Sequence, residues 1–356
     1  MNIRDRSRAF CERFGLRVPI LLAPMAGASA PALSIAVGNA GGLGACGAVL
    51  MTPEEIDAWT RQVRAASTGP FQLNLWIPDP RPVRDAEREA QLREFLATWG
   101  PEVSAEAGDV TPPDFNAQCN ALLEARAPIV SSVMGLYPPE FVARFKSLGI
   151  VWFANISTVA EAQAAAAAGA DVVVAQGTEA GGHRGCFDAN MAERAMVGLA
   201  SLVPAVVDAV NVPVVATGGI ADGRGVAAAL ALGASAVQVG TGFLRAPEAQ
   251  LPIAWAEALA AALPEDTVVS RVFSGRAGRS LATDYVRAAT AATAPQPAPY
   301  PVQRGLTAPM RAAATKRGDV QRMQAWAGQS AALARAEPAA QIVHRVWTDA
   351  VAILRL

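Results

Sequence analysis

Short apolar runs recur along the chain and are separated by amphipathic, Ala-rich stretches. Eight of these runs have the length and the apolar content of strands that are buried on both faces. They lie at residues 20–25, 43–49, 71–77, 128–134, 151–156, 171–175, 212–217 and 236–240. Helical periodicity lies between them, at residues 31–39, 53–66, 138–148, 159–168, 223–232 and 247–262.

This alternation predicts an α/β fold, a (β/α)₈ TIM barrel of roughly 250 residues. A doubly wound open sheet is the alternative arrangement of such elements. That fold usually carries a GxGxxG turn after its first strand, whereas residues 23–27 read APMAG. The barrel is therefore the predicted fold.

The chain is expected to divide into a barrel at residues 1–262 and a second part at residues 263–356. Within the first part, the long charged connection at 79–127 resembles an insertion, with an extra helix around 85–98. The connection at 177–211 is long enough for a lid. After a Pro/Ala-rich linker at 291–301, helix-like stretches follow near residues 308–317, 320–336 and 339–354. We predict that they form a C-terminal helical cap over the barrel mouth, beside the substrate pocket.

The composition excludes several classes of partner. Hydrophobic residues make up 52% of the chain, charged residues 17%, and the net charge is −1. This balance provides no basic surface for nucleic acid or an anionic membrane. The uncharged stretch at 18–53 is interrupted by prolines and six glycines, so it is not predicted to span a membrane. Four widely spaced cysteines and no N-terminal signal sequence favour a cytoplasmic protein with reduced thiols and no metal site.

The strongest chemical signal follows the sixth predicted strand, where residues 176–184 read QGTEAGGHR. Two adjacent glycines let a ligand approach the backbone closely, and His183 follows them directly. Histidine changes charge near physiological pH, and barrel active sites lie at the carboxyl ends of the strands. We therefore predict that His183 is catalytic. Cys186 could pair with it as a nucleophile, but a bystander thiol is the preferred interpretation.

Glycine-rich segments also follow the last two predicted strands, where barrels commonly bind phosphate. The first contains Gly218 and Gly219, and the second comprises Gln238, Val239, Gly240 and Thr241. Glycines allow backbone N–H groups to approach an anion, and a following helix N-terminus adds a favourable dipole. The two segments together predict a phosphate cradle.

Three further polar residues are candidate ligand contacts. Asn74 and Gln176 lie in or at the end of predicted strands, where a buried amide needs a hydrogen-bond partner. A cofactor ring could supply that partner, as could a neighbouring loop. Tyr300 ends the Pro-rich linker, and we interpret it as a wall of the substrate pocket or a packing anchor.

These motifs together resemble the nitronate monooxygenases, formerly called 2-nitropropane dioxygenases. The resemblance covers residues 18–244 and continues in the tail at YPVQ (300–303) and WAGQ (326–329). It implies a barrel that binds FMN, and His183 as the catalytic histidine. By position, the family's FMN contacts fall on Met25, Asn74, Gln176, Gly181, Gly219 and residues 238–241. Some relatives carry an additional histidine on the fourth strand, where this chain has SSVMG at 131–135. That position therefore cannot help to bind an anionic substrate here, and the resemblance does not define the substrate range.

The resemblance implies that alkyl nitronates such as propionate 3-nitronate react with O₂ to give a carbonyl compound and nitrite. An NAD(P)H-dependent flavin reductase of a quinone or an enoyl thioester is the alternative enzyme. A flavin- or phosphate-binding regulator without turnover is the alternative outside enzymes, and a histidine beside the cofactor argues against it. We expect small molecules as the partners, and a monomer or a homodimer.

Overall fold

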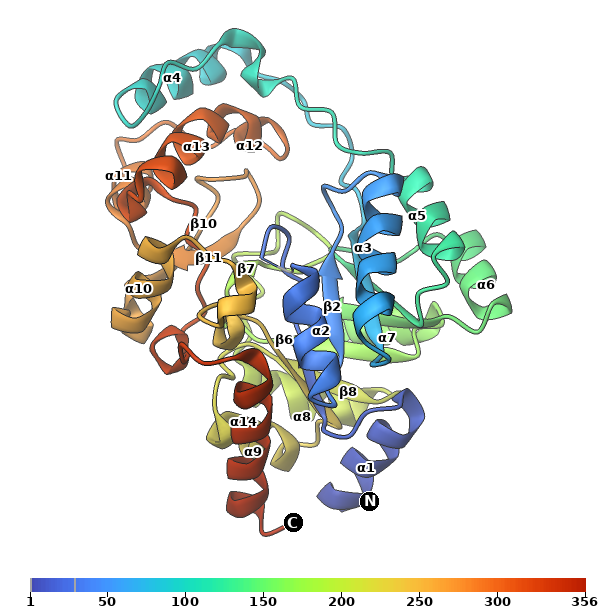
Figure 1. Ribbon diagram of the computed structural model, residues 1–356. Helices are drawn as coiled ribbons and strands as arrows, with labels where there is room; N and C mark the ends of the chain where they lie inside the picture. The colour runs from blue at the N-terminus through green and yellow to red at the C-terminus, as the bar shows by residue number, and fades with distance from the viewer. Residues whose placement is uncertain (1, 29) are drawn as a thin grey trace.

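Eight strands form one parallel sheet that curves into a barrel. The computed structural model describes residues 2–28 and 30–356. All strand pairs in this sheet are parallel, in the order β1-β9-β8-β6-β5-β4-β3-β2, and a bridge between Leu21 and Leu43 joins the first and last strands (Figure 1). The strands are β1 (Ile20–Leu22), β2 (Gly44–Gly47), β3 (Phe71–Trp76), β4 (Ile129–Val133), β5 (Val151–Ile156), β6 (Val172–Gln176), β8 (Val214–Thr217) and β9 (Ala236–Val239). The predicted barrel and each of its eight strands are confirmed.

Helices surround this barrel because their apolar faces cover the outward-facing strand residues. They are α2 (Pro31–Asn39), α3 (Pro53–Ala66), α5 (Phe115–Glu124), α6 (Pro139–Ser147), α7 (Val159–Ala167), α8 (Leu199–Ala209), α9 (Gly223–Ala231) and α14 (Ala339–Leu354). Local sequence fixes several starts. Thr52 forms a capping box with Glu55, and Thr158 and Asp222 cap α7 and α9.

Helix α1 (Ile3–Phe14), which the hydrophobic pattern did not predict, closes the amino-terminal end of the barrel. Phe10 and Phe14 lie on one face of this helix and contact Phe153 of β5. The same cluster contains the inward-facing residues Leu21 and Val174. A ligand can therefore enter the barrel only at the opposite end, where the strands have their carboxyl ends.

A second layer covers the carboxyl end of the barrel, and we call it the cap. It contains α4 (Ala86–Ala97), α10 (Ile253–Ala261), α11 (Asp284–Ala289), α12 (Val302–Leu306), α13 (Ala308–Arg317) and a small antiparallel sheet of β10 (Thr267–Ser270), β11 (Gly278–Leu281) and β7 (Gly182–His183). Leu92 and Leu96 of α4 pack with Phe273, Tyr285 and Val302 in one apolar cluster. Figure 1 shows α4 beside α12 and α13 although the sequence separates them widely.

The packing differs from the expected division at residue 262 in two ways. The last helix, α14, belongs to the barrel rather than the cap, because it packs against α9 and α2 and buries Ile342, Val343 and Val346 there. Conversely, α10 packs in the cap with Leu281 and Met323. The two-part division itself stays a proposal.

Two expected helices also differ from the structure. Residues 320–336 form only the short 3₁₀ turns Val320–Arg322 and Ala331–Leu333, because the intervening Trp326 pairs with Ser280 beside β11. The segment expected at 247–262 is a helix only from Ile253, after the 3₁₀ turn Pro247–Ala249.

Candidate functional site

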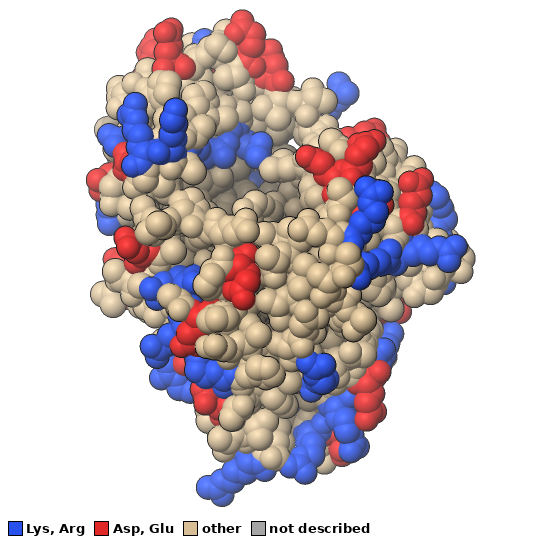
Figure 2. Space-filling view, in the orientation of Figure 1, with Lys and Arg blue, Asp and Glu red and all other residues tan. Residues whose placement is uncertain are grey.

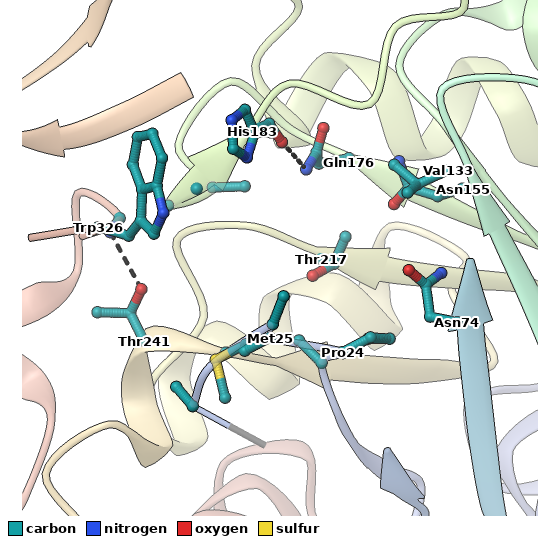
Figure 3. Close-up of a pocket in the computed structure, with 18 of the residues that line it drawn as sticks. Pro24, Met25, Asn74, Val133, Asn155, Gln176, His183, Thr217, Thr241 and Trp326 are labelled. Carbon is teal, nitrogen blue, oxygen red and sulfur yellow. Dashed lines mark hydrogen bonds between the residues drawn. The ribbon is translucent and has the colours of Figure 1, made fainter. Parts of the chain in front are cut away.

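A cavity of about 250 Å³ opens at the carboxyl ends of the barrel strands, beneath the cap. Figure 3 shows side chains from both layers around this space, with His183 and Trp326 on the cap side and Asn74 and Thr217 on the barrel strands. Almost all of the predicted site residues line it, namely Met25, Asn74, Gln176, Gly181, His183, Gly218, Gly219, Gln238, Gly240, Thr241 and Tyr300. The structure thus brings together residues from six strands or their following loops and from the tail.

Val239 is the predicted contact that does not line the cavity. Side chains alternate between the two faces of a strand, so Gln238 faces the barrel interior and its neighbour faces outward. The Val239 side chain is 3% exposed and packs in the apolar shell between strands and helices.

His183 is held by a strand rather than by a mobile lid. It belongs to β7, which pairs antiparallel with β11, and Gly278 is its direct partner. Its ring lies between two indoles, with centroid distances of 4.7 Å to Trp76 and 4.7 Å to Trp326. Its Nε2 lies 2.7 Å from Ser274 Oγ. The imidazole therefore has a fixed position in the wall of the cavity.

The surroundings of His183 keep its ring neutral. Burial, together with the positive charges of Arg276 and Arg304, lowers the pKa of His183 to about 3. The Ser274 hydroxyl can donate to the Arg276 carbonyl oxygen, 3.2 Å away. In that arrangement His183 Nε2–H donates to Ser274 Oγ and Nδ1 keeps a lone pair. In the other tautomer Nε2 accepts from the Ser274 hydroxyl and Nδ1–H is the donor.

Cys186 has the properties of a bystander thiol. It is buried, and burial, followed by the hydrogen bond to Glu161, raises its pKa to about 12. The thiolate is the nucleophilic form of cysteine, so this thiol is poorly suited to attack a substrate. His183 Nε2 is hydrogen-bonded to Ser274 instead.

The two predicted amide contacts are already used within the protein. Gln176 Nε2 donates to the His183 carbonyl oxygen over 3.1 Å, and Gln176 Oε1 accepts from the Gly185 N–H over 2.7 Å. Gln176 thus holds the backbone at His183 itself and at Gly185, two residues later. Asn74 Nδ2 donates to Ser131 Oγ on the adjacent strand, over 3.0 Å. Contacts of these amides with a cofactor stay predictions.

The glycine segments provide the backbone expected of an anion cradle. Gly218 and Gly219 adopt φ angles of +114° and +67°, a conformation that favours glycine. Among the described residues, the N–H groups of Gly218, Gly219, Gly240 and Thr241 have no hydrogen-bond acceptor. Free N–H groups at a cavity suit phosphate oxygens.

Two buried polar atoms at the cavity also lack partners within the described part of the chain. These are Gln72 Oε1, an acceptor, and Asn155 Nδ2, a donor. Buried polar atoms of this kind are normally satisfied. FMN has a phosphate that the N–H groups of the glycine segments could bind. Its ring edge has both hydrogen-bond donors and acceptors, which could pair with Gln72 Oε1 and Asn155 Nδ2. The residues present therefore fit FMN.

The tail fastens the cap onto this site. Gly328 N donates to Thr241 Oγ1 over 3.0 Å, and Gln329 N donates to the Glu179 carbonyl oxygen over 3.0 Å. A side chain at Gly181 would collide with the Gly328 backbone, because its Cβ would lie 2.5 Å from that nitrogen. The tail motif at 326–329 therefore packs against both the segment after β6 at Gly181 and the second glycine-rich segment at Thr241.

Several cavity residues were not predicted from the sequence. Trp76 ends β3, Trp326 and Ser330 come from the tail, and Arg304 follows the Tyr300 motif by four residues. Arg304 is half-buried, and its guanidinium has neither an ion pair nor a hydrogen bond to any residue in the described ranges. The only sequence signal for Arg304 is its position four residues after Tyr300, on the short helix α12 that follows it.

Positive charge also lies at the opening of the site. Figure 2 shows a hollow between the cap and the side of the barrel that carries α3 and α5, with Lys or Arg side chains on its upper rim. The rest of this face carries both signs. The positive potential is therefore local to the hollow, where it would attract an anionic ligand.

Known proteins share this arrangement. The sequence profile described as nitronate monooxygenase matches residues 8–349. The chain belongs to the nitronate monooxygenase family. A nitronate monooxygenase from Paraburkholderia phytofirmans is 37% identical over 352 residues, which cover 97% of this chain and 96% of the relative. One from Pseudomonas aeruginosa is 38% identical over 340 residues, covering 94% and 97% respectively.

Solved structures agree with this assignment. Nitroalkane oxidase from Streptomyces ansochromogenes is 38% identical, with a TM-score of 0.89 over 98% of this chain and 99% of that chain. FabK from Thermotoga maritima is 27% identical, with a TM-score of 0.75 over 98% and 97%. The chain is thus an oxidoreductase of the nitronate and nitroalkane type. In the described ranges, no helix is both long and apolar enough to cross a membrane.

Proposed function

We propose that the protein uses FMN and O₂ to oxidise alkyl nitronates, propionate 3-nitronate among them, to a carbonyl compound and nitrite. The observation that supports this most strongly is the neutral His183 in the wall of the cavity, with Arg304 in the same wall. A nitronate is an anion that is already electron-rich at carbon. The protein therefore needs only to bind and orient the nitronate, and no residue has to form it by removing a proton from a nitroalkane.

FMN would be held by the glycine segments. The free N–H groups of Gly218, Gly219, Gly240 and Thr241 would donate to its phosphate. Met25, Gln238 and Gly181 would line the remainder of the binding site. When bound, FMN supplies the acceptor for electrons from the substrate and passes them to O₂.

Arg304 and His183 would bind the nitronate oxygens. Arg304 offers a guanidinium that no described carboxylate neutralises, and guanidinium groups bind planar anions through paired N–H donors. His183 is neutral at the pH of the cell, so it contributes no positive charge. It would donate a hydrogen bond to the nitronate from Nδ1–H, in the tautomer whose Nε2 accepts from the Ser274 hydroxyl. With a neutral nitroalkane, His183 would have to remove the proton from carbon, and its low pKa makes it a weak base for that step. We therefore expect nitronates to be the better substrates.

The cap would complete the substrate pocket. Tyr300 lies against Trp76, with ring centroids 5.4 Å apart, and both residues line the cavity. Together with Trp326 they place aromatic rings around His183 and limit access of water. Tyr300 is accordingly proposed as a substrate contact.

The alternative function is an NAD(P)H-dependent flavin reductase. The likeness to FabK over almost the whole chain keeps it in consideration. Steady-state assays separate the two functions. We expect purified protein to consume O₂ and release nitrite from ethyl nitronate, with no need for NADH or NADPH. Oxidation of NADPH with a quinone or an enoyl thioester, together with no nitrite from any nitronate, would favour the reductase.

A further inference from the structure

A second cavity of about 390 Å³ adjoins the first. Its walls come from the connection after β3, from residues 108–118 and from the tail at 300–302. Val49, Trp76 and Tyr300 line both cavities. The second cavity therefore begins where the proposed nitronate site ends, on the far side of the Trp76–Tyr300 ring pair.

Four polar side chains that line this second cavity already have partners, and Gln118 is the buried one among them. Arg84 is paired with Glu89 and Asp109, over 2.5 and 2.7 Å, and Asp79 is paired with Arg276 over 3.2 Å. Gln118 Nε2 donates to the carbonyl oxygens of residues 48 and 51. Arg81 and Thr111 are exposed. The inner wall therefore offers few hydrogen bonds to a ligand.

The backbone of this cavity is also poor in donors. Six of its 20 lining residues are prolines, which carry no N–H group: Pro78, Pro80, Pro82, Pro112, Pro113 and Pro301. A phosphate or a carboxylate needs such donors, as the glycine segments of the first cavity illustrate. Ile77, Val110, Phe115 and Val302 add apolar surface to the same walls. This chemistry disfavours a nucleotide and suits a hydrocarbon chain.

We propose that the second cavity binds the aliphatic chain of the substrate, while the nitronate group lies in the first cavity. This inference rests on the proposed function, because that function identifies the nitronate as the reacting group. The new element is a binding site for the hydrocarbon chain, which does not react. The enzyme is then a nitronate monooxygenase that prefers unbranched, uncharged chains of several carbons over ethyl nitronate. Propionate 3-nitronate would remain a substrate without gaining from this cavity, because its chain is short and ends in a carboxylate.

A series of linear nitronates from ethyl to octyl tests this preference on the holoenzyme. Each buried methylene contributes about fourfold in affinity, so kcat/KM should rise by about that factor per added carbon until the cavity is filled. Ile77→Trp fills the second cavity without adding a side chain to the first, because Ile77 lines the second cavity alone. The ratio of kcat/KM for hexyl over ethyl nitronate should fall toward one in this variant.

Ile253→Trp is the matched control, because it makes the same change at a side chain that is 75% exposed and lines neither cavity. It should keep the wild-type ratio. Thr111→Trp is a second filling variant, should Ile77→Trp fail to fold. A ratio near one in the wild type, or an unchanged ratio in a folded filling variant, overturns the proposal.

Calorimetric binding separates this proposal from the proposed function. Kd values for nitroethane and 1-nitrohexane, measured on the holoenzyme, need no turnover. The protein could release no nitrite, bind 1-nitrohexane more tightly than nitroethane, and lose this difference in the filling variants. That result would contradict the proposed function and support the second cavity as a chain-binding site. Nitrite release with no dependence of kcat/KM or Kd on chain length would support the proposed function and contradict the chain-binding site.

Discussion

The glycine at position 219 provides a quantitative test of the cofactor site. Gly219→Val places a β-branched side chain at a φ of +67°, with its Cβ 3.1 Å from Glu179 Cβ. The left-handed conformation costs an L-residue about 1–2 kcal/mol. The side chain would also displace a phosphate from the N–H groups of the loop. Hydrogen bonds to a charged group contribute about 1.5–3 kcal/mol each, so losing two of them weakens binding roughly 10²–10⁴-fold.

Gly149→Val is the matched control for backbone strain. Gly149 has a φ of +70°, and a Cβ added there would meet no atom within 4 Å. Gly149 follows α6, far along the chain from the glycine segments, so this variant carries the same conformational cost without touching the proposed site. Flavin per protein is measured from visible absorbance after gel filtration, together with Tm.

We expect about one FMN per chain in Gly149→Val and little or none in Gly219→Val. Both variants should show a similar loss of Tm when the cofactor has been removed. Equal flavin content in the two variants would refute the assignment of the phosphate to this loop. Recovery of FAD from the wild type would also contradict it.

Three further results are expected from the cavity walls. His183→Asn should lower kcat/KM for neutral nitroalkanes, but by less than the roughly 10²–10⁴-fold that a well-matched general base contributes, because a pKa of about 3 makes His183 a weak base. It should affect preformed nitronates far less; an equal loss with FMN still bound would exclude the role as base. Because the pKa of His183 falls from 6.5 to about 3 on folding, the unfolded chain binds more protons between these values, so the unfolding free energy should decrease as pH falls below about 6.5. Urea titrations from pH 7 to 4 should show a smaller decrease in His183→Asn than in wild type, and parallel curves would argue against a neutral buried ring. Tyr300→Phe should raise KM for nitronates with unchanged FMN content, whereas unchanged kinetics would make Tyr300 a packing residue.

The barrel could be predicted from the sequence because its signals are local and repeated. Each strand is a short apolar run, and each following helix begins at a recognisable cap or proline, as at Thr52 and Pro53. The proposed phosphate loops follow from the same periodicity, since glycines after the last two strands fall at a known place in the fold. His183 is predicted as a site residue because glycines precede it directly after a strand, and the structure places it in the wall of the cavity.

The cap could not be predicted in the same way because long-range pairing determines it. β7 has only two residues, and its partner strand lies more than 90 positions later in the sequence. Trp326 reaches His183 through a bridge to Ser280, which no local periodicity encodes. Helix α14 has an ordinary amphipathic pattern, and nothing in that pattern indicates that it packs on α9 rather than in the cap.

The low pKa of His183 likewise depends on the fold. A histidine beside two glycines suggests a group that titrates near neutral pH. Only the folded chain brings Arg276 and Arg304 close to its ring and buries it. The expected acid–base residue is thereby changed into a neutral hydrogen-bonding group, which favours the nitronates expected from the sequence over neutral nitroalkanes as substrates.

Anaerobic mixing tests the central claim most directly. The purified protein, with its native flavin, is mixed without O₂ with ethyl nitronate and, in a separate experiment, with NADH, and the flavin absorbance is followed. The account predicts that the nitronate reduces the flavin and that NADH leaves it oxidised over the same time. Reduction by NADH together with no reaction with any nitronate would contradict it.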